Sequence, residues 1–213
     1  MNKHHKINTK YKNLRKVNRT PPMYVCDKFL TNNECNILKK EAKNKLYDSK
    51  IIEYIGGKIV YKKDNVRESK SCYLNNKNNI NISGIIDKIS KLVKKDKKYF
   101  ENIQVGCYKK GGFYKSHYDS IDMNTEIGKK FVEEGGQRII TVLMYLNDIK
   151  KGGCTYFEEI NKRFSPKKGS AIIFFPSYLN REVDTKALHC AEEVINKKWV
   201  SQLWIRDEIQ NNT

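Results

Sequence analysis

The sequence has no long apolar run, few histidines and no closely spaced pair of cysteines. No stretch approaches the roughly 20 apolar residues of a membrane-spanning helix, and the basic residues 1–20 lack the apolar core of a signal peptide. The six cysteines show neither a C-x-x-C pair nor zinc-ligand spacing. They are Cys26, Cys35, Cys72, Cys107, Cys154 and Cys190. We therefore expect a soluble, cytoplasmic protein whose thiols are free.

Acidic residues are also scarce: 24 Asp and Glu stand against 42 Lys and Arg, which gives a net charge of +18. Such a charge suggests a nucleic-acid or acidic-surface partner. However, the lysines are spread along the chain, and an abundance of Lys, Asn and Ile is what an AT-rich genome encodes whatever the function. We expect most lysines on solvated faces and keep nucleic acid as an alternative partner.

The length of 213 residues, with 38% hydrophobic residues, suits one domain with a tail. Residues 1–20 are polar and aperiodic, which predicts a disordered tail before a single domain over residues 21–213. Thr31 and Glu34 form a capping-box pattern that begins a helix. Apolar residues spaced three and four apart predict a second amphipathic helix over residues 82–93.

Short β-branched or apolar runs, separated by glycine-containing turns, predict many strands. These runs lie at residues 23–30, 51–61 (two pieces), 67–74, 138–146, 155–157, 170–175 and 198–206. The polar residues 120–136 predict a loop that serves as a lid or substrate rim. The pattern indicates an α+β fold with a jelly-roll, or double-stranded β-helix, core and supporting N-terminal helices.

His117 and Asp119 form an H-x-D triplet. Side chains alternate along an extended strand, so residues two apart face the same way and can share one metal ion. A third ligand must come from elsewhere, and because His4 and His5 lie in the tail, His189 is the remaining histidine. Two histidines and one carboxylate are typical of non-haem Fe(II) oxygenases. The triplet alone also fits an ordinary hydrogen-bonded histidine.

Lys198 begins an expected strand, on which it shares a face with Val200, Gln202 and Trp204. If that face looks into the barrel, Lys198 is a buried ammonium, which is costly unless it meets an anion. A dicarboxylate co-substrate would suit such a site, because one end can chelate the metal while the other pairs with the lysine. On its own, a lysine in a lysine-rich chain fits a solvated side chain better than a buried one.

Several spaced motifs occur in one order between about Pro22 and Arg206. They are Q-V-x-x-Y, G-G-x-Y-x-x-H-x-D, G-Q-R, T-x-L-x-Y-L-N, G-G-x-T-x-F, P-x-x-G-x-A-x-x-F, L-H and K-W-x-x-x-x-W-I-R. This order resembles the Fe(II)/2-oxoglutarate-dependent prolyl 4-hydroxylases, particularly the short single-domain kind of plants, algae and large viruses. Agreement of many motifs in order is more specific than any one of them.

The resemblance implies that His117, Asp119 and His189 hold Fe(II), and that Lys198 pairs with the distal carboxylate of 2-oxoglutarate. Residues 190–197 depart from the family pattern, because they lack its Pro and Gly and are one residue shorter. Because these residues directly precede Lys198, the departure affects where the loop places that lysine.

Five further residues match family positions. By resemblance, Tyr108 and Thr155 hydrogen-bond the 2-oxoglutarate. Tyr114, Arg138 and Trp204 match positions that line the peptide side of the site.

The resemblance implies hydroxylation of peptidyl proline at C4, with Fe(II), 2-oxoglutarate and O2 as requirements and succinate and CO2 as products. L-ascorbate is expected to rescue the oxidised enzyme. The implied partner is a proline-containing peptide or protein, either collagen-like or proline-rich.

Three alternatives are open at this point. A hydroxylase of another residue, such as lysine, would share every iron and 2-oxoglutarate residue named above. A nucleic-acid demethylase of the same superfamily would suit the basic charge, but that group usually grips the co-substrate with arginine. A non-catalytic binding module would be expected to lose a metal ligand, and none is missing.

Overall fold

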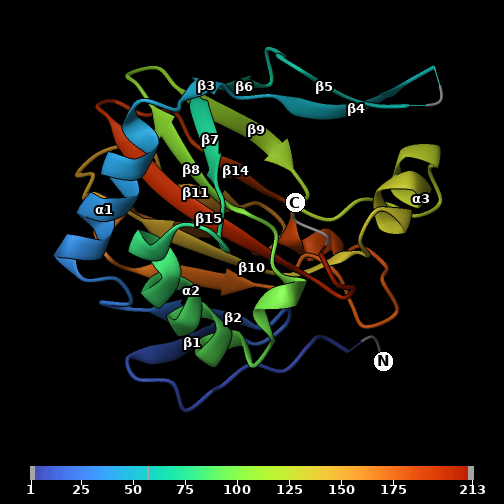
Figure 1. Ribbon diagram of the computed structural model, residues 1–213, viewed down its shortest axis with the longest axis horizontal. Helices are drawn as coiled ribbons and strands as arrows, with labels where there is room; N and C mark the ends of the chain where they lie inside the picture. Colours follow the sequence, from blue (N-terminus) through green and yellow to red (C-terminus); the bar gives the residue numbers. More distant parts are fainter. Residues whose placement is uncertain (1–2, 57, 211–213) are drawn as a thin grey trace.

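The computed structural model describes residues 3–56 and 58–210, and most of its regular structure is β-strand (Figure 1). The strands are β1 (Leu14–Asn18), β2 (Met23–Cys26), β3 (Tyr47–Asp48), β4 (Ile51–Ile55), β5 (Lys58–Lys62), β6 (Arg67–Glu68), β7 (Lys70–Leu74), β8 (Ile103–Tyr108), β9 (Phe113–His117), β10 (Arg138–Tyr145), β11 (Thr155–Phe157), β12 (Lys162–Phe164), β13 (Ala171–Phe174), β14 (His189–Ala191) and β15 (Lys198–Arg206). The helices are α1 (Asn32–Lys43), α2 (Ile80–Val93) and α3 (Glu126–Glu133), with the 3-10 helices η1 (Lys97–Tyr99) and η2 (Thr185–Ala187).

The fold is built mainly from two β-sheets. The larger has the strand order β1-β2-β13-β10-β15-β8-β7-β3, and the smaller has the order β12-β11-β14-β9-β6. Strands β4 and β5 form a separate pair, which Figure 1 shows at the upper edge of the molecule. The later strands β10, β11, β13 and β15 occupy the segments in which the sequence predicts them. The two predicted pieces at residues 51–61 are β4 and β5, with Gly57 outside the described residues.

Strand β10 separates two apolar cores. Its residues Ile140, Val142 and Met144 point into a core shared with α1 and α2, whereas Leu143 and Tyr145 point into a second core shared with the smaller sheet. This division follows from the alternation of side chains along a strand. The second core surrounds the predicted site.

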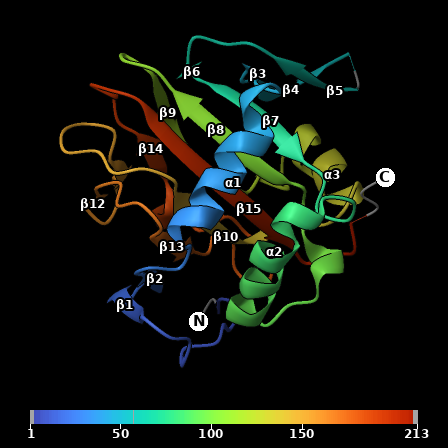
Figure 2. The same cartoon turned by 60° about the vertical axis from the view of Figure 1, so that its left-hand side comes forward.

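Helices α1 and α2 lie on the outer face of the larger sheet, as Figure 2 shows. At the start of α1, Thr31 Oγ1 accepts from the Glu34 amide (3.2 Å), and Glu34 Oε2 accepts from the Thr31 amide (2.7 Å). The predicted capping box is therefore present. The apolar face of α2 is buried at Ile82, Ile85, Ile86, Ile89, Leu92 and Val93, which confirms the predicted spacing. No helix in the described part of the chain is long and apolar enough to cross a bilayer.

Residues 3–20 differ from the predicted disordered tail. Strand β1 pairs with β2 and extends the larger sheet, and Ile7 is buried. His4 Nε2 lies 2.8 Å from Asp184 Oδ2, so this segment is tied to a distant loop. Backbone pairing and one buried apolar side chain thus order a segment whose polar composition predicts disorder. Residues 1 and 2 lie outside the described part.

Residues 120–136 also differ from prediction, because they contain helix α3. Thr125 Oγ1 accepts from the Gly128 amide at 3.1 Å and so caps the helix. The Phe131 ring is buried, with the Arg206 guanidinium 3.8 Å from its centre. The segment is therefore packed by α3, although Ile127 and Phe131 also line the main cavity. The predicted strand at residues 67–74 is broken at Ser69, and its halves join different sheets.

Candidate active site

The three predicted metal ligands come together between the two sheets. His117 ends β9 and His189 begins β14, and the two residues lie directly opposite in the antiparallel pair. Asp119 follows β9, with Oδ1 3.9 Å from His117 Nε2. One ligand atom from each of the three residues lies within 4.8 Å of the others. Strand pairing thus joins residues that are far apart in the sequence.

Both histidines are oriented by backbone carbonyl groups. His117 Nδ1 lies 2.8 Å from the Lys115 oxygen, and His189 Nδ1 lies 3.0 Å from the Ala187 oxygen. Because a carbonyl oxygen only accepts, each Nδ1 carries the proton and each Nε2 has a free lone pair. Burial, helped by the neighbouring His189, lowers the pKa of His117 to about 3. His117 is therefore neutral at physiological pH, as a metal ligand must be.

Asp119 is buried and held on two sides. Thr141 Oγ1 donates to Asp119 Oδ2 at 2.7 Å, and Arg138 Nη1 donates to the Asp119 backbone oxygen at 3.2 Å. Burial alone would raise the pKa of Asp119, but His189, His117, Arg138 and the Thr141 hydrogen bond together lower it. The group is therefore a carboxylate, and its Oδ1 is the oxygen turned toward His117.

Lys198 is buried, with 1% of its surface exposed, at the first position of β15. It lies opposite Tyr108 in the pair of β15 with β8, and its Nζ is 5.4 Å from the Tyr108 ring centre. Burial lowers the pKa of Lys198 to about 8. Within residues 3–56 and 58–210, no carboxylate oxygen lies within 4.0 Å of its Nζ. Among the described residues, this buried ammonium therefore has no carboxylate at ion-pair distance.

The short loop after β14 is fixed by Val194. The Val194 amide donates to Gly112, and the Val194 oxygen accepts from Gly111. Val194 also forms a β-bridge with Gly152. These contacts hold the loop that lacks the family's Pro and Gly, and Lys198 is buried after it.

Thr155 lies on β11 and is linked to the lysine through a residue for which the sequence suggested no role. The Tyr145 hydroxyl donates to Thr155 Oγ1 at 2.7 Å, and Lys198 Nζ is 5.7 Å from the Tyr145 ring centre. Tyr145 belongs to the T-x-L-x-Y-L-N motif. The sequence feature that could have indicated a role for Tyr145 was its inward-facing position on a predicted strand. Its hydrogen bond to Thr155 depends on the tertiary structure.

A cavity of about 940 Å³ opens beside His117 and Asp119. All three residues expected on the peptide side line this cavity: Tyr114, Arg138 and Trp204. The Tyr114 ring stacks on the His117 ring, with 3.6 Å between centres and 16° between planes. The Arg67 guanidinium also lies over the Tyr114 ring, 4.6 Å from its centre. Tyr114 therefore also holds the plane of the His117 ring.

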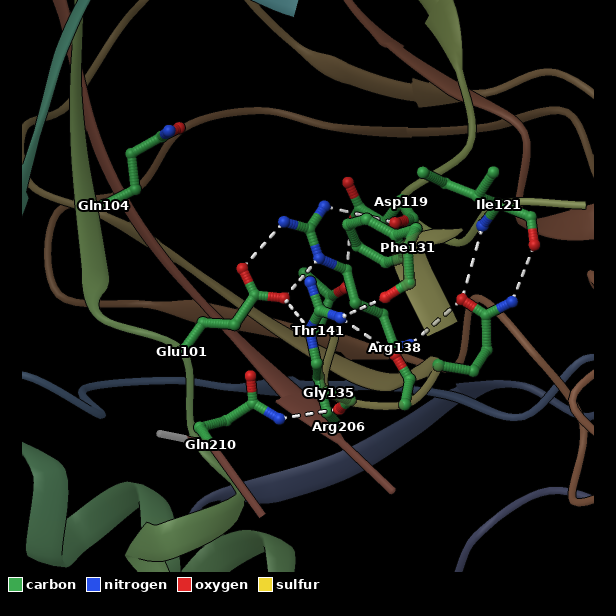
Figure 3. A network of polar contacts seen from close by, with 12 residues as sticks. Glu101, Gln104, Asp119, Ile121, Phe131, Gly135, Arg138, Thr141, Arg206 and Gln210 are labelled. Carbon is green, nitrogen blue, oxygen red and sulfur yellow. Dashed lines mark hydrogen bonds and ion pairs between the residues drawn. The ribbon is translucent and has the colours of Figure 1, made fainter. Parts of the chain in front are cut away.

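Arg138 is part of a buried charge cluster in the cavity wall (Figure 3). Its Nε and Nη2 donate to both Glu101 oxygens at 2.6 and 2.7 Å, and Arg206 Nε donates to Glu101 Oε1 at 2.7 Å. Burial would raise the pKa of Glu101, but the two guanidinium groups lower it. Because Arg138 also contacts the Asp119 backbone, it positions a predicted ligand as well as lining the cavity.

The residues fit the groups that the sequence pattern implies. Two imidazole nitrogens and one carboxylate oxygen, each on a side chain held by a second hydrogen bond, are a ligand set for non-haem iron. The buried ammonium of Lys198 fits a carboxylate of an organic diacid, since such a cation is costly without an anion.

Known proteins of one family are similar to this chain. Residues 103–206 match the model of the 2OG-Fe(II) oxygenase superfamily. A protein of Acanthamoeba polyphaga mimivirus, provisionally named a prolyl 4-hydroxylase, is 31% identical over 86% of this chain and 74% of its own length. The human prolyl 4-hydroxylase subunit alpha-1 is 34% identical over 83% of this chain, which spans 33% of the human protein.

A solved structure from the same family is also similar to this chain. The viral collagen prolyl hydroxylase vCPH from Paramecium Bursaria Chlorella virus-1, in complex with 2OG, has a TM-score of 0.68 and 26% identity. The match covers 86% of this chain and 95% of the viral chain. This chain thus has the fold of the 2OG-Fe(II) oxygenases, made mostly of β-sheet with few helices, and it belongs to the prolyl 4-hydroxylase family.

Proposed function

We propose that this protein hydroxylates peptidyl proline at C4, with Fe(II), 2-oxoglutarate and O2 as requirements and L-ascorbate as the reductant that rescues oxidised enzyme. The observation that carries the proposal is the convergence of His117, Asp119 and His189 at the edge of a large cavity, with Lys198 buried behind them. Bound iron and 2-oxoglutarate supply the activation of O2 that oxidises a substrate C–H bond, while the 2-oxoglutarate becomes succinate and CO2.

In this proposal His117 Nε2, His189 Nε2 and Asp119 Oδ1 hold the iron. The carbonyl groups of residues 115 and 187 keep the proton of each imidazole on Nδ1. Thr141 donates a hydrogen bond to Oδ2, the second oxygen of Asp119. Such partners fix the direction of a ligand and raise metal affinity. With three protein ligands, a bound iron would keep coordination positions for the co-substrate.

We assign the 2-oxoglutarate pocket to the core between the two sheets. Lys198 would pair with the distal carboxylate, with Tyr108 and Thr155 as hydrogen-bond partners. The Tyr145 hydroxyl has one proton and lies 2.7 Å from Thr155 Oγ1 and 3.2 Å from the Phe164 oxygen. Its donation to Thr155, at the shorter distance, leaves the Thr155 proton for the co-substrate. Phe157 and Phe174 contact the His189 ring and keep water from this side of the site.

The cavity on the other side suits a proline-containing peptide. Four exposed tyrosines line it, and flat aromatic rings are the surfaces on which polyproline II segments dock. They are Tyr47, Tyr61, Tyr73 and Tyr118. Trp204 Nε1 is buried in the same wall and is without a hydrogen-bond partner among the described residues, so it offers a donor to a peptide carbonyl. Tyr114 and Arg138 complete the peptide side.

We further propose that the two facing sheets are the double-stranded β-helix core of one domain over residues 21–213, which α1 and α2 support. The ordered segment 3–20 packs on the same body, since β1 joins the larger sheet. The helices cover the outer face of that sheet, and the site lies on its inner face.

The test starts with purified protein mixed with Fe(II) and 2-oxoglutarate without oxygen, followed by air and one of three substrates. The substrates are a proline-rich peptide, a collagen-like peptide and alkylated DNA. We expect a mass gain of one oxygen on proline, located by fragmentation, together with one succinate per hydroxylation.

A gain only on lysine would make the protein a hydroxylase of another residue. Loss of alkyl groups from DNA would make it a nucleic-acid demethylase. His117→Ala serves as the control for adventitious iron chemistry, because it removes one proposed ligand. Full activity in that variant would refute the ligand assignment.

A further inference from the structure

We propose that the peptide substrate carries carboxylate groups close to the hydroxylated proline, because the cavity that receives it is cationic. The inference rests on the proposed function, since it names the chemistry of the residues that flank the target proline. It depends on the charges of the cavity wall and on one buried guanidinium in that wall.

Cationic side chains outnumber carboxylates around the cavity. Five cations and two carboxylates line it, which gives a net charge of +3 with histidine neutral. The cations are Lys50, Arg67, Lys115, Arg138 and Arg206, and the carboxylates are Glu101 and Asp119. A concave surface with walls of low dielectric concentrates such a potential. Asp119 does not offset this charge for a substrate, because the proposed iron uses it.

Arg67 is the strongest single indication. Its side chain is buried, with 6% of the residue exposed, and its guanidinium contacts only neutral groups among the described residues. Nε donates to Ser69 Oγ at 2.9 Å, Nη2 lies 3.3 Å from Gln104 Oε1, and the Tyr114 ring lies beneath it. A buried cation without an anion is costly. An incoming carboxylate would offset that cost.

A second excess charge lines the same cavity. Arg138 and Arg206 share the single carboxylate of Glu101, so the cluster has a net charge of +1. Lys50 and Lys115 are exposed and line the same cavity. They add charge at positions where flanking residues of a bound peptide can reach them. Positive groups therefore surround the peptide side from several strands.

The same charge could attract a nucleic acid, and exposed tyrosines can stack on bases. Membership in the prolyl 4-hydroxylase family favours a peptide.

The experiment compares three peptides with the same central proline segment, flanked by Glu, by Gln or by Lys. For each peptide kcat/KM is measured by oxygen incorporation on proline. We expect the order Glu, Gln, Lys, with about a tenfold difference between the first and the last at low salt, as for a few partly exposed charge pairs. The difference should shrink with added KCl, because salt screens exposed charges.

A pair of double variants locates the effect. Lys50→Glu with Lys115→Glu should reverse or abolish the preference for the Glu peptide. Lys150→Glu with Lys151→Glu makes the same change in net charge on an exposed loop outside the cavity lining, and should keep the preference. The ratio between peptides is compared within each variant, so a general loss of activity does not affect the result.

Equal hydroxylation of all three peptides would overturn this inference while leaving the proposed function in place. If the cavity variants kept the preference, or the loop variants lost it, the cavity charges would not be its source. If no peptide were hydroxylated and alkylated single-stranded DNA were turned over instead, both the inference and the proposed function would be refuted.

Discussion

Replacement of Lys198 by methionine should stabilise the protein without ligand and weaken its affinity for 2-oxoglutarate. The ammonium is buried, and burial lowers its pKa from 10.5 to about 8. One pKa unit corresponds to about 1.4 kcal/mol, so keeping this lysine charged in the folded protein costs about 3 kcal/mol at pH 7. Methionine has a similar length and no charge, and therefore avoids this cost.

The stability cost of the buried Lys198 charge depends on pH in a definite direction. An unfolded lysine keeps its proton up to about pH 10.5, whereas the folded one loses it near pH 8, so the unfolded state binds more protons between these values. The cost is complete below about pH 8 and fades as the pH rises toward 10.5. We expect Lys198→Met to raise the free energy of unfolding by up to about 3 kcal/mol at pH 7, and the gain to vanish near pH 10.5.

Binding should change in the opposite direction. Loss of one partner of a buried charge pair costs about 2–5 kcal/mol, so the Kd for 2-oxoglutarate should rise about 30-fold or more. In the wild type, binding near pH 9 should take up a proton, because the carboxylate raises the pKa of Lys198 again. Calorimetry in buffers of different ionisation enthalpy measures that uptake.

The two assays together separate the proposed role from a structural one. A lysine that merely supports the fold would destabilise the protein when replaced and leave the 2-oxoglutarate affinity nearly unchanged. A destabilised Lys198→Met variant, with a stability difference that is constant from pH 7 to pH 10.5, would refute the reasoning.

Three further predictions follow from the hydrogen bonds of the site. Thr141→Val removes the donor to Asp119 Oδ2 and should weaken Fe(II) affinity about 10- to 100-fold; unchanged affinity in a competition titration would show that this bond does not orient the ligand. Glu101→Gln leaves two guanidinium groups without their carboxylate and should cost about 3–5 kcal/mol in urea unfolding; a loss below 1 kcal/mol would contradict the charge cluster. His4→Ala removes the 2.8 Å contact with Asp184, the residue that caps η2 before His189. It should lower the free energy of unfolding by about 1–3 kcal/mol and weaken the affinity for iron. Wild-type values for both quantities would mean that the N-terminal segment does not support this loop.

The early part of the chain shows where local patterns suffice. The hydrogen bonds of the Thr31–Glu34 cap join residues three apart, and the buried face of α2 repeats over one helix. Rules of short range therefore predict both. The long, β-branched segments of β10 and β15 are also evident, because they alternate between two apolar cores.

The N-terminal segment shows where composition misleads. Its residues are polar and basic, and the order in residues 3–20 comes from pairing with β2 and from contacts with residues 179 and 184. Helix α3 is a similar case, because Phe131 packs on an arginine from β15. Neither partner is visible within a window of neighbouring residues.

The sequence by itself determined which side chains are available for chemistry: one H-x-D triplet, one other histidine outside the N-terminal segment and one lysine at the start of an apolar strand. The order of motifs around them was sufficient to indicate the family. The tertiary structure decided that His189 lies opposite His117, that Lys198 is buried beside Tyr108, and that Arg138 shares Glu101 with Arg206. These contacts join strands that are distant in sequence, and their geometry depends on how every intervening segment packs.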